Sequence, residues 1–311
     1  MKKVLIFILA LILVTLCGCG IKTAKKTNKL NVVTTIFPAY DFAKQVGGDN
    51  VELTMLLKPG AESHTYEPTP QDIMKIQKCD VFIYVGGESD EWVRSILDSI
   101  DTSKIKVISM MDLVDHKVEE ETVEGMQTEE KSDGEKEYDE HVWTSPVNAM
   151  QIVRGITKTM VSVDSKNKKQ YENNRDAYLK QLEELDKQFK DVVKNAKRDT
   201  LVFGSRFPFR YFVEQYGLKY YAAFPGCAAE TEASAATIAF LIDKVKKEKI
   251  PVVFDMELSG SKFADTICET TGAKKLTLYA CHNVSAQDFS SGVTYVSLMK
   301  RNVENLKVAL Q

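Results

Sequence analysis

The chain has 311 residues, of which 44% are hydrophobic and 27% charged, and its formal net charge is −3. These proportions are typical of a folded globular protein, and at about 100–200 residues per domain the length predicts two domains. Sixteen glycines and eight prolines are too few for a collagen-like or low-complexity chain. The slightly acidic balance provides no basic field, so we expect no nucleic-acid partner.

The N-terminal segment has the pattern of an export signal. Two lysines precede an uncharged run of 13 residues, 4–16, which is shorter than the about 20 apolar residues that span a bilayer. The Leu-Cys-Gly-Cys segment that follows resembles the bacterial lipobox, and Cys19 stands where the lipidated cysteine would be. We therefore expect a signal peptide at 1–18 and a lipid-anchored polar tether at 19–29. A plain cleaved signal peptide is the alternative.

Beyond the tether, strand-like runs alternate with helical stretches. Two helix starts are marked by a cap residue before a proline, at Thr69-Pro70 and Ser145-Pro146. Such alternation predicts an α/β fold with mostly parallel sheets. The predicted strands are Leu30–Ile36, Val51–Leu57, Asp80–Gly86, Ile105–Met110, Thr200–Gly204, Lys219–Phe224, Pro251–Met256 and Lys274–Ala280.

One long helix separates the two sets of four strands. Residues 165–197 contain neither proline nor glycine, and apolar side chains recur at steps of three, four and seven, the period of an amphipathic helix with one buried seam. We interpret it as a rigid connector, which divides the chain into an N-terminal lobe at 30–162, a connecting helix at 163–198 and a C-terminal lobe at 199–311.

An acidic block interrupts the first lobe. Residues 119–140 hold 11 acidic residues against two lysines, and such a block repels itself and has little to bury. We interpret residues 117–138 as a disordered inserted loop. Solvated filler and a weak collector of cations are both compatible with this composition.

Histidines are the side chains that suggest chemistry. The chain contains no P-loop, no G-x-G-x-x-G and no G-x-S-x-G motif. Three of its four histidines, His64, His141 and His282, lie in loop-like sequence near strand ends or a helix start, where ligands bind in α/β folds. Neutral imidazoles that converge there would suit Zn²⁺, although a single histidine of this kind is more often a surface or hydrogen-bonded residue.

Several longer motifs carry a resemblance to a known family. They are PGAESHTYEPTPQDI at 59–73, DEHVWTSPVNA at 139–149, RYFVEQYGL at 210–218, AETEAS at 229–234 and TYVSLMKRNVENLKVAL at 294–310. With these motifs the chain resembles the substrate-binding lipoproteins of bacterial ABC transporters for zinc and manganese, from residue 32 to 310. That resemblance implies two α/β lobes joined by one long helix, with the metal buried between the lobes.

The resemblance also implies a set of metal ligands. His64 and His141 correspond to the family's first two ligands. The third position, histidine in zinc binders and glutamate in manganese binders, is Arg206, whose guanidinium cannot donate a lone pair. The fourth, usually aspartate, is His282. Three imidazoles favour Zn²⁺ over Mn²⁺, which prefers oxygen-rich sites.

The remaining coordination position is left open by the sequence. Glu230 and Glu232 precede a predicted helix start, so they could cap that helix, pair with Arg206 or bind the metal. Thiolates of Cys227 or Cys281, or water, are further alternatives. Because both cysteines follow strands of the second lobe in an exported protein, a disulfide between them is another option.

These observations predict a monomeric, non-enzymatic zinc-capture lipoprotein on the extracytoplasmic face of the cell membrane. It would deliver Zn²⁺ to an ABC permease powered by a separate ATPase subunit. A manganese or iron binder of the same family is one alternative. From other classes, an exported zinc hydrolase would need an open coordination position and a base, and an adhesin role in cell attachment is the third.

Overall fold

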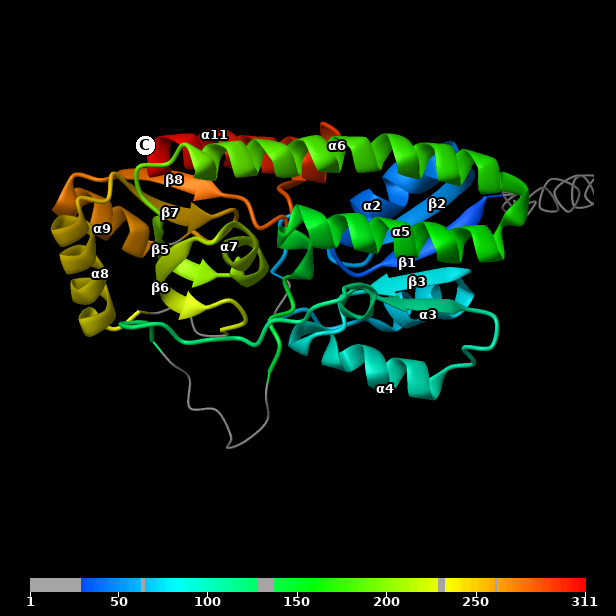
Figure 1. The fold of residues 1–311 in the computed structure, drawn as a ribbon. Helices are drawn as coiled ribbons and strands as arrows, with labels where there is room; N and C mark the ends of the chain where they lie inside the picture. The colour runs from blue at the N-terminus through cyan, green and yellow to red at the C-terminus, as the bar shows by residue number, and fades with distance from the viewer. Residues whose placement is uncertain (1–28, 63–64, 128–136, 229–232, 261) are drawn as a thin grey trace, which may run out of the picture.

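The computed structural model describes residues 29–62, 65–127, 137–228, 233–260 and 262–311. Each lobe contains one four-stranded parallel sheet, and the two lobes lie side by side along a long helix (Figure 1). The eight strands are β1 (Leu30–Thr34), β2 (Val51–Met55), β3 (Val81–Tyr84), β4 (Lys106–Ser109), β5 (Thr200–Phe207), β6 (Lys219–Pro225), β7 (Val252–Met256) and β8 (Lys274–Leu278). The predicted fold class and all eight predicted strands are confirmed, with ends that shift by up to three residues.

The N-terminal sheet has the order β2-β1-β3-β4, and β1 pairs with both β2 and β3. One of its faces packs on α3 (Pro70–Lys78) and α4 (Glu91–Ser99), and the other on α2 (Phe37–Gly47) and α5 (Pro146–Val163). The alternation of side chains explains this sandwich: Val33 and Phe82 enter the first core, whereas Val32 and Ile83 enter the second. A parallel sheet covered on both faces needs such apolar strands.

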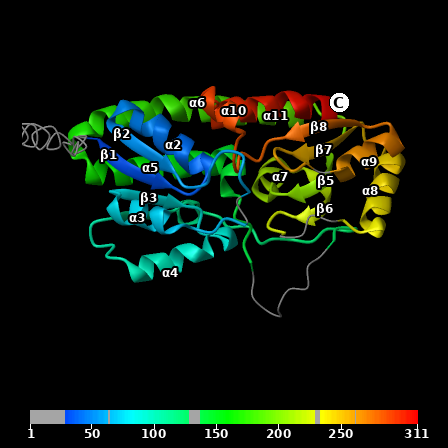
Figure 2. The same cartoon turned by 180° about the vertical axis from the view of Figure 1, so that it is seen from behind.

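The C-terminal sheet repeats the design with the order β6-β5-β7-β8. Helices α8 (Ala235–Glu248) and α9 (Lys262–Thr271) cover one face, and α7 (Arg210–Tyr216) and α11 (Tyr295–Leu310) cover the other. The reverse view shows α11 lying alongside α6 above this sheet (Figure 2).

Helix α6 (Lys168–Lys194) connects the lobes and is shorter at both ends than the connector expected at 163–198, because a separate 3₁₀ turn occupies Ser165–Asn167. Its 27 residues span about 40 Å at 1.5 Å per residue. The predicted seam is buried, from Tyr171 to Val192. In the first half of the helix the Tyr178 hydroxyl donates to Asp41 of α2 over 3.2 Å, and in the second half Asp186 accepts from the Tyr216 hydroxyl of α7 over 3.0 Å.

Both predicted helix starts are present. The Thr69 side chain accepts a hydrogen bond from the Asp72 amide at the start of α3, and the Ser145 side chain accepts one from the Asn148 amide at the start of α5. Each cap satisfies an amide that the first helical turn leaves without an intrahelical partner. Among the described helices, none is both long and apolar enough to cross a membrane.

The prediction that residues 117–138 form a disordered loop is wrong for their described parts. Residues 117–127 cross from the first lobe to the second and contact β6 and α8. Val118 and Met126 are buried on the way, with 6% and 8% exposure. These apolar side chains anchor the acidic block to the rest of the protein. The average composition of the block does not reveal them. We call residues 117–127 the strap.

Candidate metal centre

His141 and His282 meet at the boundary between the lobes. Their ring centroids are 4.4 Å apart, and the rings are nearly perpendicular at 81°. His141 immediately precedes a short 3₁₀ turn, Val142–Thr144, which leads into α5, whereas His282 follows β8 in the second lobe. The two histidines that the family resemblance implied are thus brought together from residues 141 positions apart in the sequence.

The third donor of this cluster is Glu140, which the sequence analysis did not select. One side-chain donor atom each of Glu140, His141 and His282 lies within 4.8 Å of the other two. Tetrahedral Zn²⁺ with bonds of about 2.0–2.1 Å would hold donors about 3.3 Å apart, so a small convergence closes the site. Glu140 directly precedes His141 in the sequence, and that adjacency to a predicted ligand was the available signal.

Buried backbone and carboxylate groups fix His141 in place. Its amide and its Nδ1 both donate to Oδ1 of Asp139, over 2.8 and 3.0 Å, and both side chains are fully buried. A carboxylate on Nδ1 selects the tautomer that leaves the Nε2 lone pair for a metal. Burial opposes the charged imidazole, but the Asp139 carboxylate outweighs it and raises the pKa of His141.

A glycine permits the approach of Glu140 to the loop after β3. The Ser89 amide donates to Oε2 of Glu140 over 3.0 Å. A Cβ on Gly87 would lie 2.3 Å from the Glu140 Cβ and 2.4 Å from Oε2. Because real contacts of this kind do not occur at such distances, only glycine fits at residue 87 without displacing the carboxylate.

The loop that carries His282 is joined to the first lobe by hydrogen bonds. The Phe37 amide at the start of α2 donates to the His282 carbonyl over 3.2 Å. The buried Asn283 amide group donates to the carbonyls of Lys58 and Ala61, over 2.7 and 2.8 Å. Asn283 therefore holds the segment that leads to residue 64, and sequence reasoning missed this residue.

One aromatic and one acidic side chain also support the loop that carries His282. Trp143 lies with its ring centroid 4.9 Å from that of His282, and its Nε1 donates to the Ala280 carbonyl over 2.7 Å. The Glu257 carboxylate, at the end of β7, accepts from the Ala280 amide over 2.7 Å. Burial raises the pKa of Glu257 to about 7, although neighbouring backbone amides lower it.

Arg206 lies beside the cluster as an ion-paired cation. Its Nη2 contacts Glu62 Oε2 over 2.8 Å, and its Nη1 donates to the Ala228 carbonyl over 3.2 Å. The side chain is 8% exposed and lines a cavity of about 80 Å³ together with His282 and Glu257. Glu62 of the first lobe is its described acidic partner, whereas Glu230 and Glu232 lie outside the described residues, as does His64.

The disulfide considered between Cys227 and Cys281 is not formed, because both are free thiols. The Cys281 thiol faces the Tyr279 carbonyl inside the second lobe, whereas the Cys227 amide contacts Glu120 of the strap. Burial raises the pKa of both thiols well above the usual value. Neither belongs to the cluster of donor atoms formed by the described residues.

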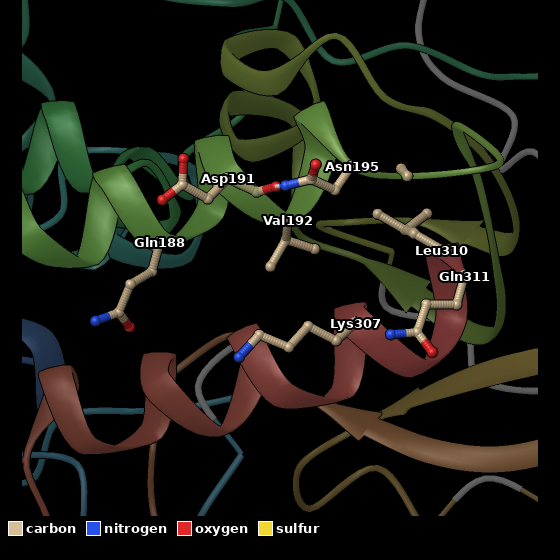
Figure 3. Close-up of a pocket in the computed structure, with 8 residues that line it drawn as sticks. Gln188, Asp191, Val192, Asn195, Lys307, Leu310 and Gln311 are labelled. Atoms are coloured by element: carbon tan, nitrogen blue, oxygen red, sulfur yellow. Dashed lines mark hydrogen bonds between the residues drawn. The ribbon is translucent and has the colours of Figure 1, made fainter.

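Two further cavities lack this donor geometry. A groove of about 290 Å³ between α6 and the end of α11 is lined by amides, aliphatic groups, one carboxylate and one ammonium (Figure 3). A wider cleft of about 590 Å³ opens next to Cys227, and five of its twelve lining residues are acidic. Its acidic residues are Glu88, Asp90, Glu91, Glu120 and Glu137.

Comparison with known proteins decides the family. The sequence model of one protein family matches residues 32–309. That family is described as ZnuA, the periplasmic component A of a zinc-uptake complex. The chain belongs to this family. It is 33% identical to the high-affinity zinc uptake system protein ZnuA of Bacillus subtilis, with 98% of this chain and 97% of that relative covered.

Two comparisons concern AdcA of Streptococcus pneumoniae. The zinc-binding lipoprotein AdcA is 34% identical over 99% of this chain, which spans only 61% of the AdcA sequence. The crystal structure of its Zn(II)-bound ZnuA-like domain is similar with a TM-score of 0.74 and 33% identity, covering 91% of this chain and all of that domain. The resemblance to metal-binding lipoproteins of ABC transporters is thereby confirmed at the level of the family and the fold.

Proposed function

We propose that the protein is the extracytoplasmic zinc-binding component of an ABC importer and captures Zn²⁺ between its lobes. The observation that carries this proposal is the buried cluster of Glu140, His141 and His282. Two neutral imidazoles and a carboxylate form a donor set suited to Zn²⁺. The names of the relatives, a zinc uptake protein and a zinc-binding lipoprotein, support the same ion.

His64 completes the proposed site as the fourth ligand. It remains a prediction from the family resemblance, because residue 64 lies outside the described residues. The described chain before it supports the assignment, since Asn283 draws Ala61 toward the loop of His282. The resulting set of three histidines and one glutamate leaves Arg206 outside the coordination sphere.

Membrane attachment and transport partners complete the proposal. Lipid on Cys19 would hold the protein at the outer face of the membrane, and a permease with its ATPase subunit would receive the ion. Capture by a monomer needs no catalytic step, so the donor atoms serve binding and release only.

A metal titration of the mature protein tests the function. After removal of bound metal, Zn²⁺ and Mn²⁺ are titrated separately against a chromogenic chelator, and bound metal is counted by mass spectrometry. We expect one tightly bound Zn²⁺ per chain and much weaker Mn²⁺ binding. Tighter binding of Mn²⁺, or no stoichiometric binding of Zn²⁺, would contradict the proposal.

A further inference from the structure

The strap connects the two lobes through its own hydrogen bonds and ion pairs. At its far end the Gln127 amide donates to the Ala223 carbonyl of β6 over 3.0 Å, and the Ser234 amide donates to Gln127 Oε1 over 2.7 Å. Lys244 of α8 pairs with Glu124 over 3.3 Å. In Figure 1 the strap runs beneath β6 toward α8, away from the lobe in which it begins.

The middle of the strap contacts the rim of the second lobe near the metal cluster. Glu121 accepts a hydrogen bond from the Tyr220 hydroxyl and pairs with Arg210, each over 3.1 Å. Its neighbour Glu120 accepts from the Cys227 amide over 3.2 Å. Glu120 therefore fixes the turn that follows β6.

That turn lies directly against the imidazole of His141. A Cβ built on Gly226 would be 3.0 Å from the His141 Cε1 and 3.2 Å from its Nδ1. The backbone of residue 226 is thus in close contact with the ring, and the amide of the next residue is the one that Glu120 holds. A shift of this turn would move the surface on which the ring rests.

The strap also holds Asp139, the residue whose carboxylate accepts from Nδ1 of the same ring. Residues 137–139 pair with the strap, because the Asp139 amide donates to the Val118 carbonyl and the Glu120 amide donates to the Glu137 carbonyl, each over 2.9 Å. Asp139 in turn accepts from His141 Nδ1. Two of the groups that contact the ring, Asp139 and the turn at residue 226, are therefore fixed by residues 118–120.

We propose that the strap is a brace that positions His141 for zinc, and that Glu120 is its positioning residue; this inference rests on the proposed function. Glu120 does not bind the metal in this view. It acts through the Cys227 amide, so that the imidazole keeps its orientation when the metal is absent. Pre-oriented donors lose less freedom on binding, and partners in the outer shell of a metal site change affinity by about 10–100-fold.

Two substitutions at residue 120 separate positioning from charge. Glu120→Ala removes both the acceptor and the charge, whereas Glu120→Gln keeps an acceptor for the Cys227 amide. We expect Glu120→Ala to weaken zinc binding by about 10–100-fold and Glu120→Gln to recover most of that loss. Glu124→Gln is the matched control on the same strap, because its exposed side chain pairs with Lys244 of α8 and contacts neither the turn at residue 226 nor Asp139 through a described ion pair, and its affinity should equal that of the unsubstituted protein.

Co²⁺ in place of Zn²⁺ supplies a readout of ligand geometry. The visible absorption bands of the bound ion should change in Glu120→Ala and remain normal in Glu120→Gln and Glu124→Gln. Thermal unfolding of the metal-free variants checks that they fold. If Glu120→Ala does not fold, Gly226→Ala takes its place. The added Cβ would press on the His141 ring from the turn that Glu120 holds, so it should change the same bands.

Each outcome decides between the inference and its alternatives. Equal losses in Glu120→Ala and Glu120→Gln would mean that charge alone matters, and unchanged binding in a folded Glu120→Ala would mean that the brace does not act on the site. Either result overturns the brace while the unsubstituted protein still binds zinc. Absence of zinc binding by the unsubstituted protein would remove the proposed function, and the brace with it.

Discussion

At the residue scale, substitutions in and beside the cluster of two histidines and one glutamate should have unequal effects on zinc affinity. His282→Ala and Glu140→Ala each delete a donor atom, so each should weaken zinc binding by more than the about 10–100-fold expected for an outer-shell partner. Arg206→Ala deletes no donor. It removes a positive charge near the ion but leaves Glu62 without its guanidinium, so we expect a much smaller net change.

Competition with a zinc chelator measures these three variants together, and Arg206→His adds a comparison. That substitution introduces the residue that the family resemblance implies for zinc binders, and it adds a fourth nitrogen if the imidazole reaches about 2.1 Å from the ion. If His282→Ala binds zinc normally while Arg206→Ala fails, the assigned donor set is wrong.

The pKa of His141 sets a second expectation. A metal-bound imidazole must be neutral, so protons compete with zinc. Because Asp139 raises the pKa of His141 above the usual value of 6.5, zinc affinity should begin to fall at a pH above 6.5 as the solution is acidified. The sign follows from the raised pKa: the competing proton binds more tightly than it would to a free imidazole.

Titrations between pH 8 and pH 5.5 test this expectation. Asp139→Asn removes the carboxylate charge, so the pH at which affinity falls should move downward, with some loss of affinity at neutral pH from poorer orientation of the ring. An affinity that stays constant across this range would argue against histidine ligands altogether.

Prediction from sequence depends on residue identity and does not reach contributions that depend on neighbours in space. The ligand roles of His141 and His282 are predictions from the family resemblance, and the structure places the two rings together. Glu140 and Asn283 were missed, since their contribution depends on which backbone groups face them. The partner of Arg206 was sought among residues of its own lobe, whereas Glu62 reaches it from the other lobe.

At the element scale, alternating strands and capped helices were predictable because each is specified locally. The period of α6 and the Thr69 and Ser145 caps are properties of a few adjacent residues. The strap was not predicted, because its stability comes from contacts with β6 and α8 that are distant in sequence. Its buried Val118 and Met126 were the local signal.

The loop of His282 provides a prediction at this scale. Asn283→Ala removes two hydrogen bonds to the carbonyls of Lys58 and Ala61, so the segment that leads to residue 64 loses two of its links to the second lobe. The Gly60 amide still donates to the Val284 carbonyl over 2.8 Å, so we expect weaker rather than abolished zinc binding and a loss of about 1–3 kcal/mol in the free energy of unfolding.

A matched control is Asn305→Ala, which deletes one hydrogen bond to the Thr277 carbonyl on β8. Isothermal titration with zinc and urea unfolding would be measured on both variants. The control should lose some stability and bind zinc normally. Equal zinc affinities for the two variants would show that Asn283 serves stability alone.

At the scale of the whole molecule, the lobes are joined by a shared hydrophobic core as well as by the connecting helix. One continuous core of buried side chains includes residues of both sheets, α6 and α11. The buried Asp41 carboxylate of α2 accepts from the Tyr178 hydroxyl of α6 and from the Tyr295 amide of α11. Large relative rotation of the lobes would break these contacts, so release of the metal must rely on small movements of the loops around the cluster.

This arrangement predicts little change of overall shape on zinc binding. Small-angle X-ray scattering of the metal-free and zinc-bound protein should give the same radius of gyration within error, because α6 contacts α2 in one lobe and α7 in the other.

Asp186→Ala tests the role of the contact between α6 and α7. It leaves the Gln215 amide group and the Tyr216 hydroxyl without their shared acceptor, which should cost about 1–3 kcal/mol in unfolding free energy. If α6 restrains the lobes, this variant should show a larger difference between its two scattering profiles than the unsubstituted protein. A marked contraction of the unsubstituted protein with zinc would instead indicate closure by a hinge and contradict the rigid connector.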